Sequence, residues 1–291
     1  MAFDKRKALQ TALVYTQQGR WDKAISEYQV ILKSDPTDLS VYNMLGDLYA
    51  RIGNKEGAIS YYLKLGELYR ADGLSVKAIA VYKKISKLDP TNVASYLACG
   101  DLYAEQGLVA EARIQYITAA DSYGKEGSTK KALNVYQKLA DLDPTNLTIR
   151  AKLAEMLLKE GLHEEATDEF LKVASGCVRN GQFPEAERFY KRVLQIANDS
   201  LEAHLGLGHL YFRSNDFANA INQLGPIHEA GQADADSMLT LAEAYQKNQQ
   251  LEGAEEVLVR LLESNPQLPN AKILLGRLRL KMGRTEDGFR V

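Results

Sequence analysis

Apolar positions along residues 42–52 recur at steps of three and four: Tyr42, Leu45, Leu48, Tyr49 and Ile52. This spacing places them on one face of a helix. Gly53 follows at the position where a helix usually ends, because glycine readily adopts the left-handed backbone conformation. A second apolar face begins at Ala58. No stretch of the chain shows sustained alternation of apolar and polar residues, so we expect an all-α protein with essentially no strand.

The same pattern returns every 54 residues. Asp35-Pro36, Asp89-Pro90 and Asp143-Pro144 mark the period. The positions that repeat with them include Gly46, Gly100 and Gly208; Tyr49, Tyr103 and Tyr211; Gly53, Gly107 and Gly161; Ala58, Ala112, Ala166 and Ala220. Self-similarity at a fixed period predicts a solenoid, in which each unit buries its apolar face by stacking on its neighbours. Such a fold has an extended surface and, by default, no deep catalytic pocket.

The residue types at these positions resemble the tetratricopeptide (TPR) repeat. The matching residues are Tyr42, Leu45-Gly46, Tyr49, Gly53, Ala58, Tyr62 and Leu65; His204, Leu207-Gly208, Tyr211 and Ala220; and Leu241-Ala242, Tyr245, Ala254, Leu258 and Pro266. The resemblance covers nearly the whole chain. It implies a right-handed TPR-like α-solenoid, a superhelix of antiparallel helix pairs, with about 16 helices. The sequence style is similar to that of bacterial TPR proteins, which implies a non-catalytic adaptor.

The period departs from that family. A TPR unit has about 34 residues, and a 54-residue unit is longer by one helix. The segment from Gly57 to Asp72 carries both a second-helix and a first-helix pattern, so we interpret it as one long helix shared by two helix pairs. We expect a single solenoid over 1–291: a partial module (1–36), three-helix modules (37–90, 91–144, 145–198) and ordinary 34-residue repeats (199–291), the last truncated.

Two features suggest local departures from this regular array. Leu224-Gly225-Pro226 should kink or stop a helix and change the superhelical curvature, with an inter-domain hinge as the alternative. The chain stops at Val291, where the last helix looks cut short. We expect either a fragment or an end that docks on a partner or a second copy.

Composition narrows the class of protein. The formal net charge is −2, so no basic field favours nucleic acid or an anionic membrane. No apolar run reaches the ~18 residues of a membrane span, and the N-terminal MAFDKRKALQ lacks a secretory pattern. We therefore expect a cytoplasmic protein without membrane insertion. Cys99 and Cys177 lie within helical patterns and are predicted to be buried free thiols.

A search for chemistry finds no catalytic constellation. His204 and His209 are five residues apart, which is a poor spacing for a metal pair on one helix. No glycine-rich phosphate-binding loop is present. The sixteen tyrosines follow the repeat spacing, so most are explained by packing. We expect no enzymatic activity, no metal and no cofactor.

The remaining candidate is the groove that the resemblance assigns to the first helix of each pair. The residue after each Leu-Gly position is acidic: Asp47, Glu67, Asp101, Asp121, Glu155 and Glu243. Four have a base four residues on, giving the expected pairs Asp47–Arg51, Asp121–Lys125, Glu155–Lys159 and Glu243–Lys247. One interpretation is a solvated helix face with local pairs. The other is a groove of alternating charge that receives a peptide or helix, lined by Asn43, Asp47, Lys64, Glu67, Asp101, Asp121, Glu155 and Glu243.

Glu67 and Asp101 have no such basic partner and are expected to be the acids most free to bind a Lys or Arg. We hypothesise that charge reversal at these two residues weakens partner binding without changing the melting point. The Lys, Asn and Arg clamp of chaperone-binding TPR domains is not matched: of the corresponding positions Leu9, Leu13, Met44, Ser60 and Lys64, only Lys64 suits it.

The function expected is a protein–protein interaction scaffold or adaptor. The alternative is the regulatory or sensor TPR portion of a larger enzyme or signalling protein. A third possibility is self-association through uncapped ends. The partner itself is not identified by any residue pattern.

Overall fold

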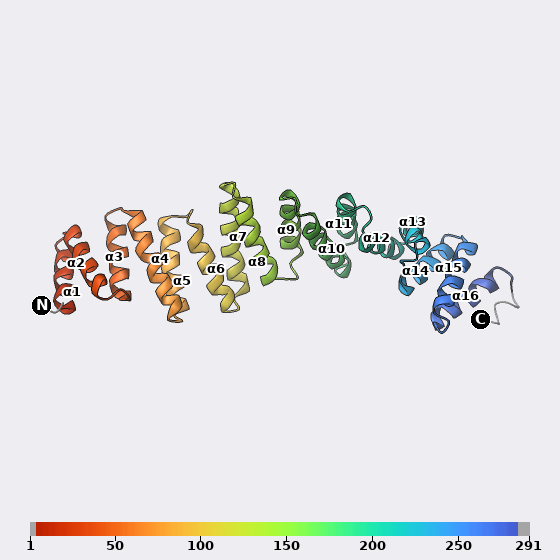
Figure 1. Cartoon of the computed structure of the whole chain (residues 1–291), viewed down its shortest axis with the longest axis horizontal. Helices are drawn as coiled ribbons and strands as arrows, with labels where there is room; N and C mark the ends of the chain where they lie inside the picture. The colour runs from red at the N-terminus through yellow and green to blue at the C-terminus, as the bar shows by residue number, and fades with distance from the viewer. Residues whose placement is uncertain (1–3, 285–291) are drawn as a thin grey trace. The chain divides into compact units, whose positions relative to one another are not determined.

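The computed structural model describes residues 4–284, and sixteen α-helices form in that range (Figure 1). The chain divides into two compact units, one up to Asp143 and one from Pro144. The first contains α1 (Lys5–Gln17), α2 (Trp21–Ser34), α3 (Leu39–Arg51), α4 (Lys55–Ala71), α5 (Ser75–Leu88), α6 (Val93–Glu105), α7 (Val109–Lys125) and α8 (Thr129–Leu142). The second contains α9 (Leu147–Lys159), α10 (His163–Arg179), α11 (Phe183–Ile196), α12 (Leu201–Arg213), α13 (Phe217–Glu229), α14 (Ala235–Lys247), α15 (Leu251–Ser264) and α16 (Pro269–Lys281).

Within each unit, every helix packs against the helix before it and the helix after it. The core runs between these neighbours: Leu65, Ile85 and Leu102 come from the consecutive helices α4, α5 and α6 and are fully buried. Each such aliphatic side chain stabilises the fold by roughly 1.5–3 kcal/mol. The all-α fold predicted from the sequence is confirmed, and residues 4–284 contain no strand. Stacking of this kind is how a solenoid builds its core.

Three helices fall in each of the segments 37–90, 91–144 and 145–198, and the middle one is the longest. These middle helices, α4, α7 and α10, have 17 residues each, whereas their neighbours have 13 or 14. Each middle helix packs on both flanking helices. The division of the chain into modules remains a prediction, and the truncated last repeat falls partly on residues 285–291, outside the described range.

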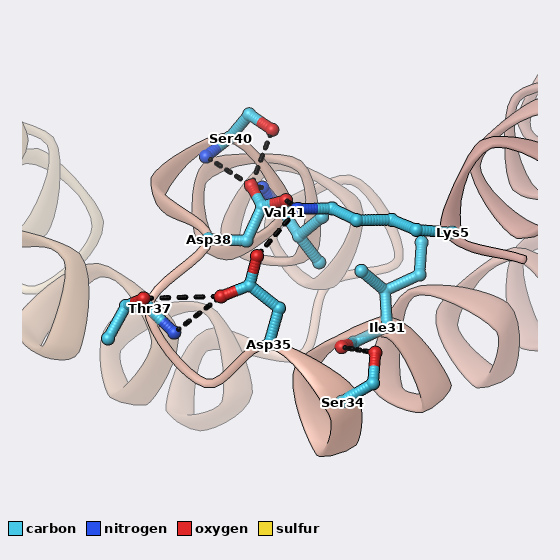
Figure 2. A network of polar contacts seen from close by, with 8 residues as sticks. All are labelled: Lys5, Ile31, Ser34, Asp35, Thr37, Asp38, Ser40 and Val41. Atoms are coloured by element: carbon cyan, nitrogen blue, oxygen red, sulfur yellow. Dashed lines mark hydrogen bonds and ion pairs between the residues drawn. The ribbon is translucent and has the colours of Figure 1, made fainter. Parts of the chain in front are cut away.

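The recurring Asp-Pro turns connect one segment to the next, and Figure 2 shows the polar contacts around the first of them, at Asp35. Asp35 ends α2, and its Oδ1 accepts hydrogen bonds from the backbone N–H and the hydroxyl of Thr37 at 3.4 and 3.2 Å. Asp38 then caps α3 by accepting from the N–H groups of Ser40 and Val41, both at 3.0 Å. Such side-chain bonds satisfy the free N–H groups of a helix start. The turn therefore ends α2 at Asp35 and begins α3 at Asp38.

Lys5 joins this turn to α1. Its Nζ lies 2.6 Å from Asp35 Oδ2 and 2.7 Å from Asp38 Oδ2. The hydrogen bond from Lys5 lowers the pKa of Asp35 below its usual value. Arg113 meets Asp143 in the equivalent way at 3.5 Å, so the same cross-link recurs two segments later.

Two kinds of glycine serve different purposes. Gly107 has φ +73° and ends α6 in the left-handed conformation. Gly100 lies inside α6, where a Cβ would sit 2.6 Å from the ring of Tyr116. Its missing side chain lets α6 and α7 approach closely. After α14 the left-handed position is held by Gln249, with φ +63°, which is a less favourable residue for this conformation.

The structure tests two further predictions. Cys99 and Cys177 are buried free thiols, as predicted, and burial raises the pKa of Cys99 to about 11. The expectation that Pro226 could stop a helix is wrong, because α13 continues through it to Glu229. Gly225 and Pro226 lie within the last turns of α13, where the proline removes one backbone donor without ending the helix.

Candidate functional site

A carboxylate, a tyrosine and a lysine from three consecutive helices meet on one face of the first unit. The Asp47 carboxylate on α3 accepts a hydrogen bond from the hydroxyl of Tyr62 on α4. Lys84 on α5 reaches the same oxygen, Oδ1, at 2.8 Å, and its Nζ lies 5.0 Å from the Tyr62 ring centroid. Asn43 donates to Asp47 Oδ2 at 3.1 Å and accepts from Lys84 at 3.0 Å. One acid therefore joins three helices.

The arrangement repeats 54 residues later. Tyr116 on α7 donates to Asp101 Oδ1 on α6 at 2.6 Å, and Lys138 on α8 reaches that oxygen at 2.8 Å. We call these two sets the Asp47 and Asp101 triads. In the second unit the corresponding residues are Glu155, Phe170 and Arg192. Here the phenylalanine has no hydroxyl to donate, and Arg192 approaches Glu155 at 3.3 Å.

The tyrosines of the triads remain protonated donors. Burial raises the pKa of Tyr62 and of Tyr116 well above the usual value of 10.0, and the adjacent carboxylate adds to the shift. A buried phenol next to a negative charge resists ionisation because the phenolate would be both desolvated and repelled. The hydroxyl–carboxylate bond therefore persists across the physiological pH range.

The local ion pairs expected from the sequence do not form among the described residues. Asp47 pairs with Lys84, while the guanidinium of Arg51 lies 5.2 Å from the Trp21 ring centroid. Glu155 pairs with Arg192 on α11. Neither Asp121–Lys125 nor Glu243–Lys247 meets the distance of an ion pair. The prediction of i,i+4 pairs is wrong: basic residues on neighbouring helices reach Asp47 and Glu155 instead, and within residues 4–284 Asp121 and Glu243 form no ion pair with the base four residues on.

The expectation that Glu67 and Asp101 are free is also wrong. Asp101 is held by Tyr116 and Lys138, and it is only about a quarter exposed. Glu67 pairs with Lys64 at 3.1 Å, one turn before it, although both side chains remain more than half exposed. Charge reversal at Asp101 would therefore disturb the packing of three helices as well as any ligand contact.

The other predicted groove residues are more scattered. Asp121 is exposed on α7. Burial raises the pKa of Tyr136, and the negative charge of Asp121 raises it further. Glu243 is half-buried on α14. The residues that sequence reasoning missed are Lys84, Lys138 and Arg192. Their signal was present in the sequence, since a base recurs there at the 54-residue period.

Two open grooves lie beside these contacts, one in each unit. The Asp101 groove, of about 540 Å³, is lined by Arg70, Asp101, Ala104, Glu105, Tyr116, Lys138, Asp141 and Leu142. Both of its cations are paired within it, Arg70 with Glu105 and Lys138 with Asp101. With three acids and two bases, this groove has a formal charge of −1.

The Glu155 groove in the second unit has the opposite sign. It measures about 680 Å³, runs between α9 and α11, and is lined by Thr148, Ala151, Lys152, Glu155, Arg188, Phe189, Lys191, Arg192 and Gln195. Four bases face one acid, giving a formal charge of +3. Within residues 4–284, no carboxylate forms an ion pair with Lys152 or Arg188. Positive charge here exceeds what the local structure neutralises.

Among residues 4–284, no cluster of three or more His, Cys, Asp and Glu residues could hold a metal ion. None of the described helices combines the length and the apolar character needed to cross a bilayer. The stacking of successive helices with a recurring residue pattern places the chain in the class of α-helical repeat proteins.

Comparison of the sequence with known families identifies the repeat. Models described as tetratricopeptide repeat match residues 178–236 and 212–278, and a TPR repeat model matches residues 12–53. A model of the soluble NSF attachment protein, SNAP, matches residues 52–172. The chain belongs to the tetratricopeptide repeat family. Proteins of this family are generally protein-interaction scaffolds.

A search of curated proteins finds no significant match. Solved structures similar to the chain include MamA from Desulfovibrio magneticus RS-1, at 16% identity and TM-score 0.38, covering 61% of this chain and 89% of that one. A tetratricopeptide repeat protein from Parabacteroides merdae has 15% identity and TM-score 0.33, with 95% and 98% covered. The Cut9–Hcn1 heterotetramer of the APC/C has 15% identity and TM-score 0.35, with 96% and 70% covered. At these TM-scores the likenesses carry no argument about function.

Proposed function

We propose that the chain is a non-catalytic scaffold that binds a peptide or helix of a protein partner in the groove of its first helices. The observation that carries the proposal is the pair of open, charged grooves beside the Asp101 triad and the Glu155–Arg192 contact. The binding set remains the one expected from the sequence, with Lys84, Lys138 and Arg192 added. A cytoplasmic, bacterial setting is part of the same proposal.

The binding residues predicted from the sequence fall into two groups according to the contacts that they make. Asp47 and Asp101 hold helices together, because each accepts hydrogen bonds from two other helices. Glu67 and Asp121 leave their charges exposed to solvent. Exposed charges of this kind steer association and select partners more than they stabilise the fold. Glu67 and Asp121 are therefore the acids with which to test binding.

The test is affinity capture from a lysate of the source cells with quantitative mass spectrometry, using the full chain as bait. A Glu67→Arg/Asp121→Arg variant is run beside the wild type. The matched control is Glu56→Arg/Glu111→Arg, which makes the same charge change at exposed sites in the first turns of the same helices, α4 and α7. Melting temperatures of all three proteins are compared first.

We expect a partner that the wild type and the control enrich and the groove variant loses. Retention of every partner by the groove variant would move the binding site to another face or to the chain ends. Enrichment of no protein by the wild type would contradict a scaffold function.

A further inference from the structure

The lining of the Glu155 groove carries more positive charge than its one acid neutralises. We infer that this groove binds an acidic segment of a protein partner, one that presents carboxylates on either side of an apolar side chain. The inference rests on the proposed scaffold function and specifies the partner's chemistry at one site. Four basic residues, Lys152, Arg188, Lys191 and Arg192, line a groove whose only acid is Glu155.

The repeat itself shows that this charge is not required by the fold. The positions one period earlier, in the first unit, are Ala98 for Lys152, Asn134 for Arg188 and Gln137 for Lys191. They lie on α6 and α8, which pack on α7 as α9 and α11 pack on α10. Only the base at 138, the equivalent of Arg192, is common to both segments. The other three positions are uncharged in the earlier segment, so this packing of three helices does not require a charge at them.

Two of the four bases of the Glu155 groove, Lys152 and Arg188, form no ion pair with the acids of residues 4–284, whereas Arg192 and Lys191 each pair with one acid. Arg192 approaches Glu155 at 3.3 Å, compared with 2.8 Å for Lys84 and Lys138 in the triads. Its Nε is buried and makes no hydrogen bond. Lys191 pairs with Glu187, outside the groove lining, at 2.6 Å. Lys152 and Arg188 are exposed. A ligand carboxylate would therefore displace few existing bonds.

The floor of the groove adds an apolar contact. Phe189 is part of the lining, and its ring stacks on the buried Phe170 with centroids 6.0 Å apart. Arg188 lies over the same Phe189 ring at 4.8 Å. Phe189 is only partly buried, so the exposed part of its ring, beside the Arg188 guanidinium, offers an apolar contact for one Leu or Phe of a ligand. Arginines at the rim can bind carboxylates through two hydrogen bonds.

A protein segment fits this groove better than a nucleic acid. The chain has a net charge of −2, and the Asp101 groove of the first unit is negative. Binding of a polyanion relies on a continuous basic track that follows its backbone. A positive site confined to about 680 Å³ instead matches a short acidic stretch. The electrostatic complementarity then supplies partner selection.

The experiment is selection of a random displayed peptide library on the full chain, followed by fluorescence anisotropy titration of the enriched peptides. The test variant is Lys152→Glu/Arg188→Glu. The matched control is Lys247→Glu/Arg277→Glu, which reverses one exposed lysine and one exposed arginine on α14 and α16 of the same unit. Helix content and unfolding midpoints establish that both variants are folded. A short oligothymidylate and phosphatidylserine vesicles are titrated in parallel.

We expect the enriched peptides to be acidic with at least one large apolar residue, and the test variant to bind them at least about tenfold more weakly. The control should bind them as the wild type does, and added salt should weaken binding. Enrichment of neutral or basic peptides, or equal binding by the test variant, would overturn the inference. So would binding of only the oligothymidylate or the vesicles in a manner that depends on Lys152 and Arg188.

The outcome is separable from that of the scaffold proposal. A partner captured through Glu67 and Asp121, together with no acidic peptide bound at Lys152 and Arg188, would leave the scaffold standing and remove this inference. No captured partner and no enriched peptide would remove both.

Discussion

The hydroxyl of Tyr116 on α7 donates a 2.6 Å hydrogen bond to the carboxylate of Asp101 on α6. Lys138 on α8 reaches the same oxygen at 2.8 Å, so a single acid fastens three helices. Tyr116 itself is buried. The Asp47 triad joins α3, α4 and α5 in the same way, through Asp47, Tyr62 and Lys84.

Tyr116→Phe tests how much the hydrogen bond from Tyr116 to Asp101 contributes to stability. It removes a hydroxyl that donates to a charged acceptor, and we expect the free energy of unfolding to fall by about 1–2 kcal/mol. Urea denaturation followed by circular dichroism measures the change. Tyr123→Phe is the control on the same helix, because its ring lies under Lys131 without a hydroxyl hydrogen bond in the described structure. Equal stabilities of the two variants would show that the Tyr116–Asp101 hydrogen bond does not stabilise the fold.

Gly100→Ala and Gly124→Ala form a second test, of close helix approach. Both glycines lie in helices of the first unit, where alanine would normally stabilise by about 0.5–1 kcal/mol. A Cβ at Gly100 would meet the Tyr116 ring at 2.6 Å, whereas nothing lies within 4 Å of one at Gly124. We expect Gly100→Ala to destabilise by about 1–3 kcal/mol and Gly124→Ala to stabilise. Chemical denaturation of both gives the answer, and two shifts of the same sign would contradict it.

The sequence was sufficient to predict the helices and those of their ends that fall at glycines, for reasons that act locally. Glycines such as Gly107 stop helices through their own backbone freedom, whereas the stop predicted at Pro226 does not occur. Periodic apolar residues also defined the long middle helices. These features depend on residues within one or two turns of each other, so a linear pattern records them.

The polar contacts of the grooves could not be predicted by the same argument. Asp47 lies four residues from Arg51 but pairs with Lys84, because the packing of α5 brings the Lys84 ammonium to 2.8 Å from Asp47 Oδ1. A second example is the position occupied by Tyr96, Arg150 and His204 in successive segments. Each donates to, or meets, a carbonyl oxygen six residues earlier, at 3.2, 2.7 and 3.0 Å. Three different residue types make one contact, and no residue pattern shows it.

Arg150 provides the third prediction, on a buried ion pair. Its Nη1 lies 2.7 Å from Glu169 Oε2, and the two side chains are 15% and 9% exposed. Arg150→Met leaves the Glu169 carboxylate buried with only Lys172 beside it. We expect a loss of about 3 kcal/mol, measured by urea denaturation.

The double variant Arg150→Met/Glu169→Met should recover most of that loss, since no buried charge is left unpaired. Lys172→Met is the exposed control, expected to cost less than about 1 kcal/mol. A double variant that is no more stable than Arg150→Met would indicate that the pair itself, and not the stranded carboxylate, determines the cost.

His228 provides a prediction about pH. It lies on α13 with only 8% of its surface exposed, and burial lowers the pKa of its imidazole below 6.5, with a further contribution from Arg260 that Glu256 and Glu229 oppose. The unfolded chain therefore binds a proton at this residue at higher pH than the folded chain does. The stability that neutral His228 contributes is present above pH 6.5 and is lost as the pH falls below it.

His228→Gln removes this titration. The free energy of unfolding, measured by urea denaturation at intervals from neutral pH to about pH 5, should fall less steeply for the variant than for the wild type. The two slopes can differ by at most about 1.4 kcal/mol per pH unit, the value for one proton. His163→Gln is the matched substitution, made at an exposed histidine at the start of α10. Parallel profiles for wild type and His228→Gln would mean that His228 takes up its proton equally well in the folded chain.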